Sequence, residues 1–164
     1  MISAILLAAG QSKRMDGENK LLKKYKKKHL INHILNTLTK SKISKIIVVL
    51  GFQRSKVRKV LLKNKKIKCI YNKKYKSGMA SSIKAGLKKI SQKNTGFLII
   101  HADMPLVSTG IINLFCLGLN KSNKEIFVPI NKKKIGNPIG FKRSMIKFLK
   151  KIKGDKGAKK IIRR

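Results

Sequence analysis

Residues 2–22 read ISAILLAAGQSKRMDGENKLL, and this stretch decides the fold class. The apolar run 2–7 predicts a buried strand, and the small residues after it predict a tight turn. A backbone with so little side-chain bulk can approach a ligand closely and point N–H groups at it. The residues of this turn that we expect to contact a ligand are Leu7, Ala8, Ala9 and Gly10.

Two cations follow the turn. Arg14 offers a planar fork of donors for phosphate oxygens. Lys20 is a compact cation, suited to the charge that develops on a transferring phosphoryl group. The stretch is neither a Walker A motif nor GxGxxG. We therefore expect a phosphate-binding loop of another type, with Arg14 and Lys20 as catalytic residues.

The rest of the chain alternates strands and helices. The strands are continuous apolar runs, which favours a mainly parallel sheet covered on both faces. Its 164 residues suggest one domain over 1–164. Expected strands or extended segments are 2–7, 45–50, 67–71, 97–100, 126–129 and 138–141, and expected helices are 30–38, 57–62, 83–90, 111–119, 146–152 and 158–162.

The charge is extreme, with 42 Lys+Arg against 5 Asp+Glu and a net charge of +37. Two interpretations stay open: a surface selected for a polyanion, or A/T-rich codons that supply Lys, Ile and Asn together. No motif of a nucleic-acid-binding module accompanies the lysines, so nucleic acid is not the favoured partner.

The sequence predicts neither a membrane protein nor a secreted one. No apolar run reaches the ~18 residues that a membrane span needs, and the opening segment lacks the basic start of a signal peptide. Cys69 and Cys116 form no CxxC, so we expect reduced core thiols. These features indicate a cytoplasmic protein.

The chain has only 5 Asp+Glu, so an acidic residue inside a motif is a candidate functional residue. Asp103 follows an apolar run, in the sequence His101-Ala102-Asp103-Met104-Pro105. A carboxylate just past a buried strand is well placed to hold Mg²⁺, which would bridge nucleotide phosphates. Ligands of parallel sheets bind at the carboxyl ends of strands, where both motifs fall. His101 is more often a structural histidine at this position.

Three further segments carry weaker signals. Residues 72–87 include Asn72, Gly78, Ser81 and Ser82, and we expect the two serines to cap a helix and face a nucleotide. Gly136-Asn137-Pro138 and Gly154-Asp155-Lys156-Gly157-Ala158 each predict a turn. His29 and His33 lie four apart but have no third ligand, so we expect no zinc site.

Together these motifs resemble the molybdenum cofactor cytidylyltransferase group of the MobA-like nucleotidyltransferases. The family opening LAAGxSxRMGxxKLL stands here as LLAAGQSKRMDGENKLL, and its NxxxxxGMxxSxxxGL segment covers Asn72 to Leu87. Its GDMP, GHP and GDxGA motifs appear as Ala102–Pro105, Gly136–Pro138 and Gly154–Ala158. Five blocks in the family's order cover nearly the whole chain.

The resemblance implies a Rossmann-like, three-layer α/β/α fold and transfer of CMP from CTP to a molybdopterin-type cofactor, with release of pyrophosphate. It implies that Asp103 binds Mg²⁺ and that Asn72, Gly78, Ser81 and Ser82 join the turn in nucleotide binding. It places Asn137 and Pro138 at the acceptor. An LAAG-type loop goes with CTP in this family, and an LAGG-type loop with GTP.

The chain departs from the family in three places. Residues 16–19 lengthen the phosphate loop, and Asn137 replaces the usual His. The family also continues to a DxDTPxD segment with a second metal-binding Asp, so we expect a domain shortened at its carboxyl end. Two alternatives therefore remain: transfer to a sugar or polyol phosphate, and a polyanion-binding relative without turnover. The sequence leaves the oligomeric state open.

Overall fold

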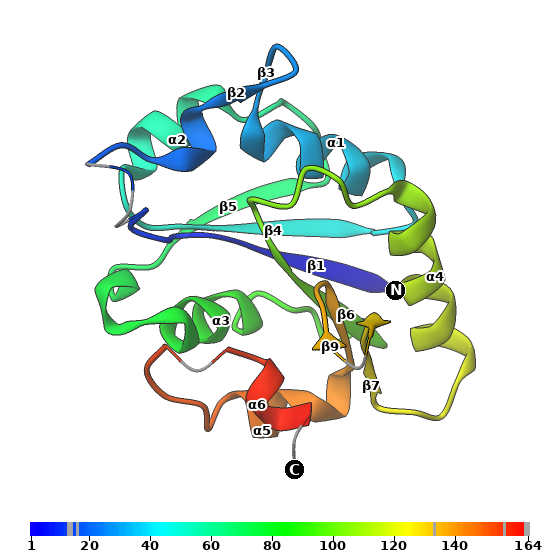
Figure 1. Cartoon of the computed structure of the whole chain (residues 1–164). Coiled ribbons are helices and arrows are strands. Elements are labelled where there is room, and N and C mark those ends of the chain that lie inside the picture. Colours follow the sequence, from blue (N-terminus) through cyan, green and yellow to red (C-terminus); the bar gives the residue numbers. More distant parts are fainter. Residues whose placement is uncertain (13–14, 16, 133, 156, 163–164) are drawn as a thin grey trace.

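A six-stranded sheet runs through the centre of the molecule, in the order β5-β4-β1-β6-β10-β7 (Figure 1). The computed structural model describes residues 1–12, 15, 17–132, 134–155 and 157–162. The strands of this sheet are β1 (Ile2–Ala8), β4 (Lys45–Leu50), β5 (Ile67–Tyr71), β6 (Gly96–His101), β7 (Ile126–Phe127) and β10 (Ile139–Lys142).

The four strands β5, β4, β1 and β6 are parallel, whereas β10 pairs antiparallel with β6 and with β7. The prediction of a mainly parallel sheet is therefore confirmed. Parallel pairing brings the carboxyl ends of β1 and β6 together, so that Leu7 lies opposite His101. The two motifs that follow these strands consequently meet at one edge of the sheet.

Helices cover both faces of the sheet, as expected. On one face lie α1 (Leu30–Lys40), α2 (Arg54–Val60) and α4 (Thr109–Lys121). On the other lie α3 (Met79–Leu87), α5 (Ile146–Leu149) and α6 (Lys159–Ile162), and Figure 1 shows the two layers above and below the strands. The structure is thus the three-layer α/β/α fold that the resemblance implied.

Aliphatic side chains fill both halves of the core. The central strands β1 and β4 are buried on both faces, which explains why they are continuous apolar runs. Phe97 and Phe141 stack with their ring centroids 5.7 Å apart, on the face that α3 covers. The cysteines are free, and burial raises the pKa of the Cys116 and Cys69 thiols, in agreement with reduced core thiols.

Several helix boundaries differ from the prediction. The helix expected over 57–62 begins earlier and ends earlier, at Arg54 and Val60, and Ile90 lies beyond the end of α3. The helix expected over 146–152 is shorter, since Arg143–Met145 forms a 3₁₀ turn (η3) and α5 ends at Leu149. Amphipathic spacing continues past these ends because apolar side chains in the following loops also pack on the core.

Short elements that the sequence did not predict connect the main ones. They are two hairpins, β2 (Lys24–Tyr25) with β3 (Lys28–His29) and β8 (Ile130–Asn131) with β9 (Lys134–Ile135), and two 3₁₀ turns, η1 (Lys20–Leu22) and η2 (Tyr75–Ser77). The turn η1 ends the loop that follows β1 and contains Lys20.

Candidate active site

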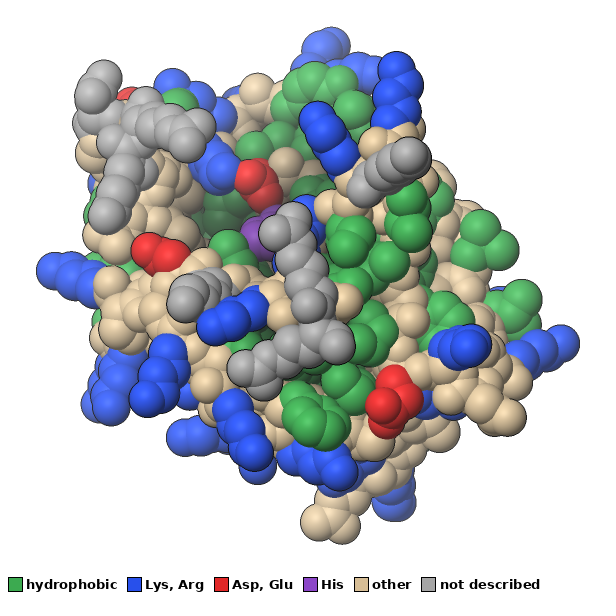
Figure 2. Space-filling model, turned by 60° about the horizontal axis from the view of Figure 1, so that its bottom comes forward, with side chains coloured by type: hydrophobic (Ala, Val, Ile, Leu, Met, Phe, Trp, Pro, Cys, Tyr) green, Lys and Arg blue, Asp and Glu red, His purple; other side chains and the backbone are tan. Residues whose placement is uncertain are grey.

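A cavity of about 330 Å³ opens at the carboxyl ends of β1 and β6. Residues from both predicted motifs line it, together with the start of α3 and the turn after α5. In the space-filling view, histidine and acidic side chains gather in a hollow on a surface otherwise dotted with lysines (Figure 2). Asp103 and Asp155 line this cavity, although the whole chain has only 5 Asp+Glu and a net charge of +37.

The turn after β1 presents bare backbone to the cavity. Gly10 is exposed and lines it, and a Cβ built on Gly10 would meet no atom within 4 Å. The space over this glycine is therefore open to a ligand. Leu7 and Ala9 also line the cavity, whereas Ala8 is buried and supports the turn from behind.

Hydrogen bonds anchor the loop that follows. Asn19 is buried; its side-chain oxygen accepts from Leu21 N (3.1 Å), and its amide donates to Phe52 O (3.1 Å). The amide of Gln53 donates to Gly17 O (2.9 Å). These bonds fasten the loop to the turn after β4, so its extra length does not displace Lys20. Arg14 and Asp16 lie outside the described residues.

Lys20 and Asp103 form an ion pair across the cavity, although 83 positions separate them in the sequence. The backbone of Lys20 is held as well, since its N–H donates to Ser12 Oγ (3.1 Å). Burial opposes ionisation of Asp103, but the hydrogen bond and charge of Lys20 outweigh it and lower the pKa of Asp103. The structure thus brings two of the predicted catalytic residues together as a charged pair.

His101 lies beside this pair and lines the same cavity. Burial lowers the pKa of His101, and the opposing charge of Asp103 only partly offsets it. The buried position therefore favours the neutral imidazole. Sequence reasoning set His101 aside, and its only signal was its position two residues before Asp103.

The start of α3 lies against the 154–155 turn. Gly78 has φ +100°, and a Cβ there would lie 2.5 Å from Gly154 C, so only glycine fits. Met79 N donates to Asp155 Oδ1 (3.3 Å), and Ala80 N donates to Gly154 O (3.0 Å). This contact closes one wall of the cavity and brings Asp155 to its rim.

The predicted capping role of the two serines is wrong. α3 begins at Met79 with Gly78 as its N-cap, so Ser81 and Ser82 lie within the helix. The amide of Asn72 instead donates to Ser81 Oγ (2.8 Å) and to Ser82 Oγ (3.0 Å). Of the three, only Ser82 lines the cavity, and Asn72 and Ser81 hold the helix in place behind it.

The predicted acceptor residues lie elsewhere. Asn137 and Pro138 are joined by a cis peptide bond at the start of β10, and neither lines this cavity. The lining also includes residues that sequence reasoning missed: Gln11, Leu21, Tyr75, Lys76, Met79, His101 and Asp155.

Within the described part of the chain, no three His, Cys, Asp or Glu side chains cluster as a metal site. His29 Nδ1 and His33 Nε2 each lie 2.6 Å from a backbone carbonyl, of Leu22 and Tyr25 respectively.

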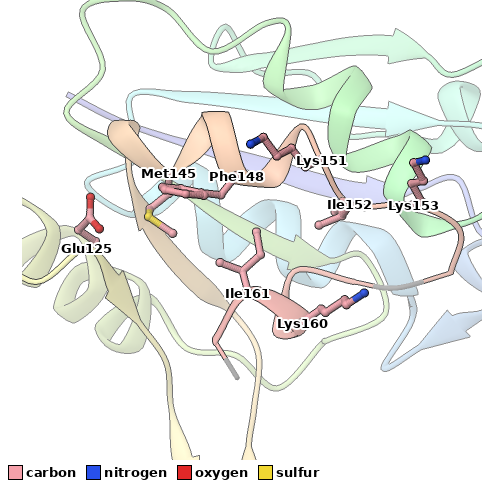
Figure 3. A pocket seen from close by; sticks show the side chains of 8 residues that line it. All are labelled: Glu125, Met145, Phe148, Lys151, Ile152, Lys153, Lys160 and Ile161. Carbon is pink, nitrogen blue, oxygen red and sulfur yellow. The ribbon is translucent and has the colours of Figure 1, made fainter. Parts of the chain in front are cut away.

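A larger hollow of about 430 Å³ lies between α5 and α6 (Figure 3). Met145, Phe148, Ile152 and Ile161 give it apolar walls. Among the described residues that line it, the one acid is Glu125, which accepts a hydrogen bond from Ser144. Lys151, Lys153 and Lys160 also line it.

Comparison with known proteins identifies the class. The crystal structure of Rv0371c from Mycobacterium tuberculosis H37Rv superposes with a TM-score of 0.87 at 25% identity, over 99% of this chain and 82% of that one. The same protein in complex with manganese gives 0.81 at 23% identity, with the same coverage. The fold is the nucleotide-sugar transferase fold that these nucleotidyltransferase neighbours share.

The family follows from the sequence match. The model of the MobA-like NTP transferase domain matches residues 4–164, so the chain belongs to the MobA-like nucleotidyltransferases. The bifunctional protein GlmU of Buchnera aphidicola is 32% identical over 147 residues, which are 89% of this chain and 30% of GlmU. A probable molybdenum cofactor guanylyltransferase of Clostridium perfringens is 32% identical over 127 residues, 77% of this chain and 58% of that protein.

The chain spans less than two thirds of the length of each of these curated relatives. Among the described residues, no helix is long and apolar enough to cross a membrane.

Proposed function

We propose that this nucleotidyltransferase moves CMP from CTP to a molybdopterin-type acceptor and releases pyrophosphate. The observation that carries the proposal is the Lys20–Asp103 pair beside the open backbone of Gly10, in one cavity. An oxygen of the acceptor's terminal phosphate attacks the α-phosphorus, and the bond from this phosphorus to the bridging oxygen of the leaving pyrophosphate breaks. The chemistry needs positioning and neutralisation of charge more than it needs a covalent intermediate.

Lys20 supplies the positive charge at the triphosphate. Its ammonium pairs with Asp103 in the absence of nucleotide, and phosphate oxygens compete for the same donor protons. The fixed backbone of Lys20 keeps this ammonium at the cavity in both states. By sequence, Arg14 adds a second set of donors.

Asp103 suits a divalent cation that arrives with the nucleotide. Mg²⁺ is commonly held by one or two carboxylates together with substrate phosphates and water. Asp103 is a hard oxygen donor in a half-buried cavity, and the absence of a three-residue cluster among the described side chains fits an ion shared with phosphates. When bound, the ion neutralises charge on those phosphates. Mg²⁺ and Mn²⁺ both fit this donor.

The turn and α3 form the nucleotide side of the proposal. Leu7, Ala9 and Gly10 line the cavity on one side, and Gly78 and Ser82 line it on the other. Asn72 and Ser81 act by holding Ser82 and the start of α3 in position. The choice of CTP rests on the LAAG-type turn.

The proposal also assigns the acceptor, a molybdopterin-type cofactor. A relative named as a probable molybdenum cofactor guanylyltransferase supports a molybdenum cofactor acceptor and makes GTP the competing nucleotide. Asn137 and Pro138 lie outside the cavity lining, so an acceptor role for them requires the bound acceptor to extend beyond it toward β10.

The test is a matrix of nucleotides and acceptors. Purified protein is incubated with Mg²⁺ or Mn²⁺, each of the four NTPs, and either molybdopterin cofactor or a set of sugar and polyol phosphates, and pyrophosphate is measured. We expect release with CTP and molybdopterin. Release with a sugar or polyol phosphate would replace the acceptor assignment, and no release with any pair would refute the proposed reaction.

A further inference from the structure

The turn that carries Asp155 connects the wall of the active-site cavity to α6. Gly78, before the start of α3, packs against Gly154 of this turn. The last glycine of the turn packs there too, since a Cβ built on Gly157 would lie 2.9 Å from Met79 Sδ. Met79 lines the cavity, so α6 begins beside the active site. In Figure 1, α6 lies between α3 and β9.

Lys159, the first residue of α6, reaches the strand that precedes Asn137 and Pro138. Its ammonium donates to Ile135 O at the end of β9 (2.5 Å), one residue before Gly136. Lys159 therefore lies between the cavity wall and the segment for which the resemblance implied an acceptor role. An ammonium has three donor protons, and this bond uses one of them, so Lys159 is held in place and can still donate to a phosphate.

The charge of Lys159 also acts on the cavity. Burial is the main cause that lowers the pKa of His101, against the charge of Asp103, and the charges of Lys20 and Lys159 lower it further. Such an effect weakens with distance, so the Lys159 ammonium lies near a histidine that lines the cavity. In Figure 2, cationic side chains border the histidine in this hollow. Two elements, η1 and α6, thus bring positive charge to the site.

We propose that Lys159 binds the terminal phosphate of the molybdopterin acceptor and orients it toward the α-phosphorus of the nucleotide. The acceptor then lies between the cavity and the Asn137-Pro138 segment. This inference rests on the proposed function, because it assigns the site of the second substrate of that reaction.

The position of Lys159 suits the acceptor better than the nucleotide. Lys159 is exposed and lies outside the cavity lining, whereas Lys20 lies in it, beside the open backbone of Gly10. A second phosphate that approaches the triphosphate is repelled by it, and a cation at the point of entry offsets this repulsion. With Lys159 as its partner, the acceptor phosphate takes no donor proton from Lys20.

The kinetic test compares Lys159→Ala with Lys151→Ala as the matched control. Lys151 is exposed, carries the same charge and lines the separate hollow between α5 and α6. Pyrophosphate release is measured at varied molybdopterin and at varied CTP. Lys159→Ala should raise KM for molybdopterin at least about tenfold, because it removes a charge-assisted hydrogen bond, and should leave KM for CTP within about twofold. Lys159→Arg keeps the charge and should restore most of the loss, and Lys151→Ala should change neither KM.

Binding of molybdopterin is measured separately by equilibrium dialysis without nucleotide, and urea denaturation checks that each variant is folded. We expect saturable binding by the wild type, at least about tenfold weaker binding by Lys159→Ala, and binding within about twofold by Lys151→Ala. The same binding pattern without any pyrophosphate release would refute the proposed reaction and still support this site. Equal binding by the wild type and Lys159→Ala would overturn the assignment of Lys159, as would no saturable binding by the wild type, or an equal rise of both KM values in Lys159→Ala.

Discussion

Replacing Lys20 with alanine should separate a catalytic role of its ion pair from a structural one. The Lys20 and Asp103 side chains are 46% and 33% exposed, so solvent screens the pair. Pairs of this kind contribute about 0.2–1 kcal/mol to stability. Removing one donor that stabilises developing charge costs roughly 10²–10³ in kcat, or about 2.7–4 kcal/mol. We therefore expect Lys20→Ala to lose turnover by that factor and less than about 1 kcal/mol of unfolding free energy.

Lys23→Ala is the matched control. Lys23 pairs with Glu18 at 3.0 Å, with side chains 56% and 68% exposed, and it lies outside the cavity lining. This variant removes the same charge from the same loop region. Turnover is measured by pyrophosphate release, and stability by urea denaturation. If both variants lose activity equally, or if Lys20→Ala retains it, the assignment of Lys20 is wrong.

Three further predictions concern the cavity and the packing of the turn after β1. Gly51→Ala should destabilise the fold by about 1–3 kcal/mol in chemical denaturation, because its Cβ would lie 2.7 Å from Ala9 Cβ; unchanged stability would contradict the packing. Gly10→Ala should leave stability unchanged but weaken nucleotide binding in calorimetry, because its Cβ would fill the space we assign to the ligand; full affinity would exclude that space. The lowered pKa of Asp103 contributes stability above the ordinary value of 3.8 that is lost as pH falls through its folded pKa, so in EDTA the acid-induced loss of stability should be shallower in Lys20→Ala, and identical slopes would contradict this.

The main strands were predictable because they are buried on both faces and therefore stand out as continuous apolar runs. Helix ends were less predictable, since α2 starts with charged residues after Gln53 in a left-handed conformation, with no capping side chain. The first hairpin was missed because its turn residues, Lys26 and Lys27, have φ 43° and 64°, a geometry for which Asn-Gly is the usual signal.

The residues of the site that could be predicted are those in motifs that directly follow a strand. Both motifs were expected at strand ends, and parallel pairing of β1 with β6 then brings Lys20 to Asp103. The contribution of Asp155 was not predictable, because it depends on the contact of its turn with Gly78. Met79, whose N–H donates to Asp155, lies 76 positions earlier in the chain. Likewise, the buried network of Asn72 could be seen only once α3 was placed.

We expect this cavity to bind a nucleoside triphosphate through Lys20 and Asp103. Its most direct test is calorimetric titration with CTP, and with inorganic triphosphate for comparison, with and without Mg²⁺ or Mn²⁺. Wild-type protein should bind one CTP, and more tightly than it binds triphosphate. The metal ion should increase the affinity for CTP, and this increase should be abolished in Asp103→Ala and retained in Lys23→Ala. Equal binding of CTP and triphosphate at several sites, unaffected by Asp103→Ala, would show that surface lysines alone bind the anion and would exclude a nucleotide site at Lys20 and Asp103.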